Sequence, residues 1–201
     1  MMKIYLLLLI GLLTACSKPP ETLTRLPDDA VILAFGDSLT YGTGASSGHD
    51  YPSILAALAT REVINEGVPG EISEDGLKRL PELLDEYQPK LLILIHGGND
   101  MLRKIPGQQT AENLRKMIAE AKNRGIAVLM LGVPEPNLFL LDSADFYQTV
   151  AETDHVPADL NTLPDILGNK DLRSDIAHPN DAGYQLMAEN IFNLLKQAGA
   201  L

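Results

Sequence analysis

Short apolar runs alternate with longer helical stretches along most of the chain, and this alternation constrains the fold more than any other feature. Three runs are almost wholly apolar, and each is followed within two residues by glycine: residues 30–35, 91–95 and 126–131. Runs this short and this apolar are typical of parallel strands that are buried on both faces. The pattern predicts an α/β domain in three layers, with helices on both sides of a mainly parallel sheet.

The stretches between these runs carry apolar residues at helical spacing. Helices are predicted at residues 52–61, 73–87, 110–124, 144–151 and 180–198, and a further short strand at 62–65. Ser73 is expected to cap the second of these helices, because a serine hydroxyl can accept from the first free N–H groups. Pro81 lies inside the same stretch and is expected to kink or split it.

Composition limits the classes of function. The chain has 201 residues, which suits a single domain, and its net charge of −11 disfavours binding to nucleic acid. It contains one cysteine, so an intrachain disulfide or a thiolate metal cluster is not expected. The sequence shows no phosphate-binding loop, dinucleotide fingerprint or His-x-x-x-His pair. We therefore expect neither a metal nor a cofactor.

The N-terminus has the pattern of a targeting segment. Lys3 precedes an apolar run at residues 4–13, and Leu-Thr-Ala-Cys ends it at Cys16. This run is shorter than the roughly 20 residues that a membrane-spanning helix needs. It resembles the lipobox of a bacterial lipoprotein, since the single cysteine stands at the required place. An ordinary secretory signal, or a buried helix ending in cysteine, remains an alternative.

The lipobox resemblance implies a division of the chain into three parts. Residues 1–15 would be a signal peptide, residues 16–29 a tether that begins at an acylated Cys16, and residues 30–201 the folded domain. The acyl chains would anchor the protein to a membrane. By resemblance to Gram-negative lipoproteins, Ser17 favours the outer membrane. The expected location is the cell envelope, facing the periplasm.

Two distant segments supply the parts of a serine hydrolase. Ser38 follows the first predicted strand, and His178 lies 140 residues later with Asp175 three residues before it. A serine hydroxyl needs a base to remove its proton, and the base needs a group to orient it. Asp175 can accept from Nδ1 of the ring and leave Nε2 facing Ser38. Gly-Asp-Ser is also ordinary turn chemistry, and most histidines are not catalytic.

Acyl transfer also needs donors for the oxyanion. Asn99 offers a side-chain amide, and the backbone N–H groups of Gly70 and Ser38 are further candidates. Each of the three follows a predicted strand. Parallel sheets bind ligands outside the carboxyl ends of their strands, so these positions agree with a shared site. The alternative for the glycines before Asn99 is a simple turn into a helix.

Four ordered blocks now resemble the SGNH (GDSL) hydrolases. They are Gly-Asp-Ser-Leu at 36–39, residues 65–70, Gly-Gly-Asn-Asp at 97–100 and Asp-Ile-Ala-His-Pro-Asn at 175–180. The resemblance covers nearly the whole expected domain and implies the flavodoxin-like SGNH fold. It implies Ser38 as nucleophile, His178 as base, Asp175 as orienting acid, and Ser38, Gly70 and Asn99 as the oxyanion hole. Pro-Gly-Glu at 69–71 departs from the Ser-Gly-Asp of many relatives.

The resemblance implies an esterase acting through an acyl-enzyme on Ser38, similar to arylesterases, lysophospholipases and thioesterases. The expected substrate is a small-molecule or lipid ester. The alternatives are a carbohydrate O-acetylesterase of the same superfamily and a non-catalytic binding lipoprotein. Pocket walls are expected from residues 41–51 and 138–147, whose apolar members could equally be core: Phe139, Leu140, Leu141, Phe146 and Tyr147.

Overall fold

The computed structural model describes residues 21–135 and 142–201, and its centre is a parallel five-stranded sheet. The strands are β1 (Ile32–Gly36), β2 (Val63–Gly67), β3 (Leu91–Ile95), β4 (Ala127–Leu131) and β5 (Ala158–Asp159). Their order is β2-β1-β3-β4-β5, which is the doubly wound order of flavodoxin-like folds. In the register, Ile32 lies opposite Val63 on one side and Leu91 on the other. The predicted α/β class and parallel sheet are confirmed.

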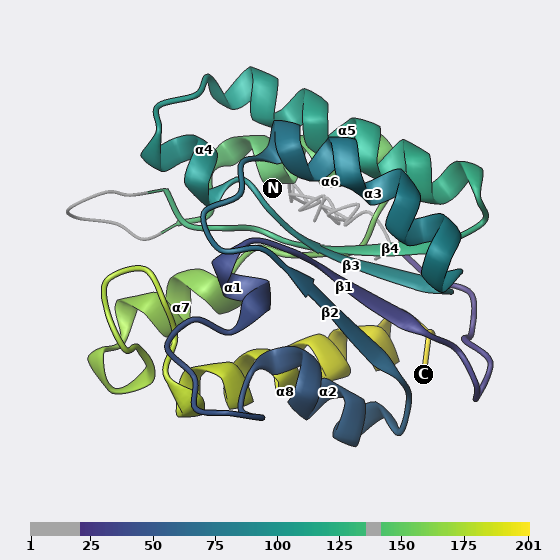
Figure 1. The fold of residues 1–201 in the computed structure, drawn as a ribbon, viewed down its shortest axis with the longest axis horizontal. Coiled ribbons are helices and arrows are strands. Elements are labelled where there is room, and N and C mark those ends of the chain that lie inside the picture. Colours follow the sequence, from purple (N-terminus) through teal and green to yellow (C-terminus); the bar gives the residue numbers. More distant parts are fainter. Residues whose placement is uncertain (1–20, 136–141) are drawn as a thin grey trace, which may run out of the picture.

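Helices cover both faces of the sheet (Figure 1). One layer holds α3 (Ser73–Tyr87), α5 (Gly107–Asn123) and α6 (Asp145–Asp154), and the other holds α2 (Tyr51–Ala59), α7 (Thr162–Gly168) and α8 (Asp181–Gln197). Two short helices, α1 (Ser38–Tyr41) and α4 (Gly98–Leu102), follow β1 and β3, and a 3₁₀ turn, η1 (Lys170–Leu172), precedes α8. The strands β1 and β3 therefore both end in short helices at the same edge of the sheet.

The core explains why the apolar runs became strands. Every residue of β1 and β3 is buried, because helices pack on both faces of these central strands. The helices contribute one apolar stripe each, such as Leu80 and Leu84 of α3 and Met187 and Ile191 of α8, all of them buried. Burying such a side chain stabilises the fold by roughly 1.5–3 kcal/mol. The rigid sheet fixes the positions of the loops at its carboxyl edge.

Several local predictions differ from the structure. Ser73 is the first residue of α3 and not its cap, and both its N–H and its hydroxyl donate to the carboxylate of Asp100, at 2.8 and 2.5 Å. The helix α3 continues through Pro81. Both β5 and α7 were missed, because a two-residue strand and a seven-residue helix containing Pro164 show no clear period.

The predicted tether at residues 16–29 needs correction in its second half. The N–H of Leu23 donates to the carbonyl of Ala198, and the N–H of Leu26 donates to that of Ala200, both at 2.8 Å. Leu26 is also buried in the core. The folded body therefore includes residues 23–29, because they pack beside the end of α8. Cys16 and the predicted signal lie outside the described residues, among which no helix has the length and hydropathy to cross a bilayer.

Candidate active site

Ser38 stands at the junction of β1 and α1. The preceding Asp37 caps this short helix, and its Oδ1 accepts from the N–H of Leu39 at 3.0 Å. The strand β1 is fixed by pairing with β2 and β3, so Ser38 emerges at the carboxyl edge of the sheet. Its side chain is partly exposed, while Asp37 and Leu39 on either side of it are buried. The local fold thus exposes the Ser38 hydroxyl to solvent while the backbone around it is held by buried neighbours.

Asp175 and His178 lie on a tight turn that the carboxylate itself organises. Oδ1 of Asp175 accepts from the N–H groups of Ala177 and His178, at 2.7 and 2.9 Å. An antiparallel bridge between Arg173 and Pro179 closes the turn just before α8. The same carboxylate lies 2.9–3.0 Å from Nδ1 of the His178 ring. The three-residue spacing therefore folds the acid back onto both the backbone and the imidazole.

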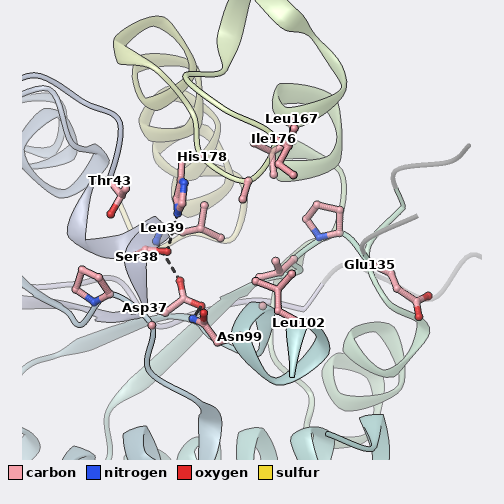
Figure 2. A pocket seen from close by; sticks show the side chains of 16 residues that line it. Asp37, Ser38, Leu39, Thr43, Asn99, Leu102, Glu135, Leu167, Ile176 and His178 are labelled. Carbon is pink, nitrogen blue, oxygen red and sulfur yellow. Dashed lines mark hydrogen bonds between the residues drawn. The ribbon is translucent and has the colours of Figure 1, made fainter. Parts of the chain in front are cut away.

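The ring of His178 connects this turn to Ser38. Its Nε2 lies 3.0 Å from Oγ of Ser38, although the two residues are 140 positions apart (Figure 2). The Asp175 carboxylate has only acceptors to offer, so Nδ1 must carry the ring hydrogen. The lone pair of Nε2 then faces Ser38, whose hydroxyl donates. This arrangement can transfer the serine proton to the ring.

The charge on Asp175 supports that tautomer. Partial burial raises the pKa of Asp175, but the hydrogen bonds from the His178 ring and the Ala177 N–H outweigh it, so the pKa lies below its ordinary value. The carboxyl is therefore ionised at neutral pH. Its side chain is 54% exposed, so solvent screens its attraction to an imidazolium. Asp175 therefore acts on the His178 ring more by orienting it than by the electrostatic field of its charge.

The loop after α1 packs against this turn at Gly44. The residue has a φ of +94°, and a Cβ there would lie 2.1 Å from Oγ of Ser174 and 2.6 Å from the carbonyl oxygen of Pro179. Only glycine fits such an approach without displacing the turn. The contact joins the segment after Ser38 to the segment that carries His178, and so helps keep their side chains in register.

Gly70 lies in a β-turn beside Ser38. The N–H of Glu71 donates to the carbonyl of Val68 at 3.1 Å, and Gly70 has a φ of +80°. Proline at the second position and glycine at the third are the residues of a type II turn. Because the turn bond uses the N–H of Glu71, the N–H of Gly70 stays outside it. Pro69 and Gly70 both line the cavity that contains Ser38.

Asn99 reaches the same cavity from α4, with its amide held by a neighbour that the sequence did not indicate. Nδ2 of Asn99 donates to Oδ2 of Asp37 at 3.2 Å, which leaves its second hydrogen for another acceptor (Figure 2). Asp37 is 1% exposed, and burial raises its pKa above the ordinary value. The available signal was a carboxylate directly before Ser38, but the contact spans 62 residues and no spacing rule predicts it.

The cavity beside Ser38 has a volume of about 330 Å³ and mostly apolar walls. These walls come from five separate segments: Leu39, Leu102, Val133, Pro134, Leu167 and Ile176. Where the structure describes the predicted walls, they are confirmed only at Thr43, and the alternative of a core position holds for Tyr147. Only Thr43 comes from residues 41–51, Tyr147 is buried with its hydroxyl on the carbonyl of His96, and Phe146 lines a different hollow. Phe139, Leu140 and Leu141 lie outside the described residues.

The cavity contains Ser38, His178, Gly70 and Asn99 together, and Asp175 contacts the ring from behind. The structure thus brings together every predicted site residue except Cys16, which is not described. Across residues 21–135 and 142–201, no group of three histidine, cysteine or acidic side chains is arranged to hold a metal ion.

A doubly wound sheet with serine, histidine and aspartate hydrogen-bonded in series at its carboxyl edge defines a serine hydrolase. The family described as GDSL-like Lipase/Acylhydrolase matches residues 34–186, and the chain belongs to this family. The resemblance based on the four sequence blocks is confirmed.

Similar proteins agree with this assignment. Esterase TesA of Pseudomonas aeruginosa is 31% identical over 186 residues, covering 87% of this chain and 92% of that protein. Thioesterase 1/protease 1/lysophospholipase L1 of Escherichia coli K12 is 34% identical over 107 residues, or 52% of this chain and 51% of that protein. A crystal structure of TesA superposes with a TM-score of 0.76 at 27% identity, covering 84% of this chain and 99% of that one. The chain is a serine esterase.

Proposed function

We propose that Ser38 attacks the acyl carbon of an ester or thioester while Nε2 of His178 takes its proton. The observation that supports this most directly is the 3.0 Å contact between Nε2 and Oγ, with Nδ1 already engaged by Asp175. The imidazolium then gives the proton to the departing alcohol or thiol. In the second half, water attacks the acyl carbon while His178 takes its proton. The bond from the acyl carbon to Oγ breaks, the acid is released, and His178 returns the proton to Ser38.

In this proposal the oxyanion is stabilised by three donors, the N–H groups of Ser38 and Gly70 and the side-chain amide of Asn99. Their support is that all three residues line one cavity and that Asp37 holds the Asn99 amide in place. Donors fixed in advance stabilise the developing charge without reorganising during the reaction. Removing one such donor typically lowers kcat by about 10²–10³.

The apolar walls favour an acyl tail over a polar one. Leu102 and Ile176 are 62% and 85% exposed at the mouth of the cavity, where they can cover an acyl chain. The names of the similar proteins point to acyl esters and thioesters, among them lysophospholipids. An acetyl group would occupy a small part of about 330 Å³ and leave these walls uncovered, so we place the carbohydrate O-acetylesterase and the binding lipoprotein second.

The test is a series of p-nitrophenyl esters from acetyl to palmitoyl, with matched acyl thioesters, on the full chain in detergent. We expect kcat/KM to rise beyond acetyl, because each buried methylene contributes roughly 0.8 kcal/mol. A maximum at acetyl with a loss beyond a few carbons would favour the acetylesterase instead. Complete absence of turnover across the series would favour the binding protein.

The proposed location is the bacterial cell envelope, with an acylated Cys16 anchoring the enzyme to the outer membrane on its periplasmic side. The support is the sequence alone: the apolar run, the Leu-Thr-Ala-Cys pattern and the single cysteine. Cys16→Ser should move the protein from the membrane fraction to the soluble periplasmic fraction while esterase activity persists. Persistent membrane association of this variant would contradict the anchor.

A further inference from the structure

A partly buried ion pair begins at Glu71, the residue after Gly70, and takes no part in the mechanism above. Nε and Nη2 of Arg79 donate to the two carboxylate oxygens of Glu71, at 2.7 and 2.9 Å. The Glu71 side chain is only 8% exposed, and the guanidinium lies 4.2 Å above the centre of the Phe35 ring. A bidentate pair over an aromatic face holds both partners in one geometry. Glu71 is therefore one of the most constrained side chains near the site.

His96 is the third member of this network. It is fully buried, and its Nε2 lies 3.1 Å from Oε2 of Glu71. Its Nδ1 accepts from the N–H of Gly97 at 3.2 Å, so Nε2 carries the ring hydrogen and donates to the carboxylate. Burial raises the pKa of Glu71, but the hydrogen bonds from His96 and Arg79 lower it below the ordinary value. The carboxylate is thus ionised and accepts from both neighbours.

The network lies within three residues, along the chain, of each of the three proposed oxyanion donors. Glu71 directly follows Gly70, and His96, directly after β3, lies three residues before Asn99. Arg79 also donates to the carbonyl of Gly36, two residues before Ser38, at 3.3 Å. One set of side chains therefore ties together the ends of β1 and β3 and the turn after β2.

The Gly70 turn needs such a restraint, because packing does not hold it. A Cβ built at Gly70 meets no described atom within 4 Å, and Val68, Pro69 and Gly70 are all exposed. Among the described residues, hydrogen bonds hold the turn in place of packing. The N–H of Val68 donates to the carbonyl of Gly36 at 3.0 Å, and Arg103 donates to the carbonyl of Gly70 at 2.8 Å. Glu71 adds an attachment through its side chain.

We propose that Glu71, held by Arg79 and His96, is a positioning residue that aims the N–H of Gly70 at the oxyanion. This inference rests on the proposed function, since it needs Gly70 to be a donor in an acyl transfer. Losing the attachment frees the turn to shift, and a displacement of about 1 Å remote from the chemistry can cost roughly 10²-fold in rate. The loss falls on the transition state, because the ground-state carbonyl gains little from that donor.

Glu71→Ala is the main variant, and Glu66→Ala is its matched control. Glu66 also contacts Arg79, at 3.4 Å, and accepts from the Tyr87 hydroxyl at 2.9 Å, but it lies on β2 and not on the turn. Both variants thus remove a carboxylate partner of Arg79. Glu71→Gln keeps the length and one acceptor, and serves if Glu71→Ala folds poorly.

The experiment measures kcat and KM on p-nitrophenyl butyrate with the full chain, and Ki for an alkyl trifluoromethyl ketone, whose adduct with serine carries an oxyanion. We expect Glu71→Ala to lower kcat about 10–100-fold with KM within about 2-fold, and to raise Ki by the same factor as kcat/KM falls. Glu71→Gln should lose about 3–10-fold, and Glu66→Ala should stay within about 2-fold of wild type.

Equal losses of kcat in Glu71→Ala and Glu66→Ala, or a fall in kcat with an unchanged Ki, would overturn the positioning role. So would wild-type kcat in both Glu71 variants. These outcomes leave the proposed function intact if Ser38→Ala is inactive. Turnover that persists in Ser38→Ala would refute the proposed function and the positioning role with it, so the two failures are distinguishable.

Discussion

Two clusters of serine, histidine and aspartate lie on the described part of the molecule, and they differ in which group stands between the other two. We call them the Ser38 cluster and the Ser46 cluster. Their members are Ser38, His178 and Asp175 in the first, and Ser46, His49 and Asp181 in the second. The residue types are identical and the distances similar. The difference between the clusters therefore lies in which side chain contacts which.

In the Ser46 cluster the serine stands in the middle. Its hydroxyl donates to Oδ2 of Asp181 at 2.5 Å, and its N–H donates to Oδ1 at 2.7 Å. The hydroxyl hydrogen of Ser46 is then already used. Nδ1 of His49, 3.1 Å from Oγ of Ser46, must therefore donate to that oxygen. The carbonyl of Ser47, 3.2 Å from Nδ1, is a second acceptor for that hydrogen. A ring nitrogen that already carries a proton cannot take another from serine.

In the Ser38 cluster the ring stands in the middle, and this reverses the direction of the proton. The carboxylate engages Nδ1, so the opposite nitrogen is left as the acceptor for the serine hydroxyl. The surroundings differ as well. Ser38 opens into an apolar cavity shared with Gly70 and Asn99, whereas Ser46 lies exposed on a loop beside the start of α8. The order of the contacts, more than the residue types, therefore decides which serine can give its proton to a histidine.

Replacing the two serines should separate the Ser38 cluster from the Ser46 cluster by the largest difference in kcat. Ser38→Ala should lower kcat by about 10⁴-fold or more, because the acyl-enzyme cannot form. Ser46→Ala should leave kcat within about 2-fold and cost roughly 1 kcal/mol of unfolding free energy through its lost hydrogen bonds. Steady-state hydrolysis and thermal unfolding of both variants check this. A large kcat loss in Ser46→Ala would mean that the second cluster takes part in the chemistry.

The two aspartates give the next largest contrast. Asp175→Asn should lower kcat about 10–10³-fold, since the amide can turn its NH₂ toward Nδ1 and favour the wrong tautomer. The 54% exposure of Asp175 places the loss below the roughly 10⁴-fold known for a buried orienting acid. Asp181→Asn should leave kcat within about 2-fold. The kcat ratio of the two variants is the measurement, and equal values would remove the distinction between the clusters.

The parts of the site that sequence predicted are those encoded within short segments. Asp175 and His178 are three residues apart on one turn, and the apolar runs of β1 and β3 are long enough to show that they are buried on both faces. That spacing singled out His178, since His49 has a serine and not an aspartate three residues before it. The four blocks of the family resemblance then supported its pairing with Ser38 across 140 residues.

The parts that sequence missed depend on contacts between distant loops. Asp37 meets Asn99 across 62 residues, and Glu71 meets His96 across 25, so no local period encodes either contact. Where the structure describes the predicted cavity walls, it differs from the prediction at Tyr147 for a related reason. The ring of Tyr147 could line a cavity, but it packs in the core, and its hydroxyl donates to the carbonyl of His96. Apolar composition alone does not say which apolar surface is left open.

The smallest expected effect is on stability at acid pH, where the two clusters behave alike. Hydrogen bonds from Ser46 lower the pKa of Asp181 below its ordinary value, and those from His178 and Ala177 do the same for Asp175 against the opposing effect of burial. A carboxyl whose pKa is lower in the folded state contributes stability above its unfolded value of about 3.9, and loses it as pH falls through the folded value. Electrostatics therefore acts in the same direction at both sites.

Thermal unfolding between neutral pH and about pH 2.5 should show that both carboxyls lose stabilising free energy as the pH falls. Wild type should lose stability more steeply below about pH 4 than either Asp175→Asn or Asp181→Asn, because each variant lacks one carboxylate that must be protonated. Both variants should change this acid slope in the same direction while differing in kcat. A slope equal to that of wild type in Asp175→Asn would show that its hydrogen bonds do not lower the pKa. Acid slopes that change in the same direction, with unequal kcat, would mean that the order of contacts, and not the charge, separates the two clusters.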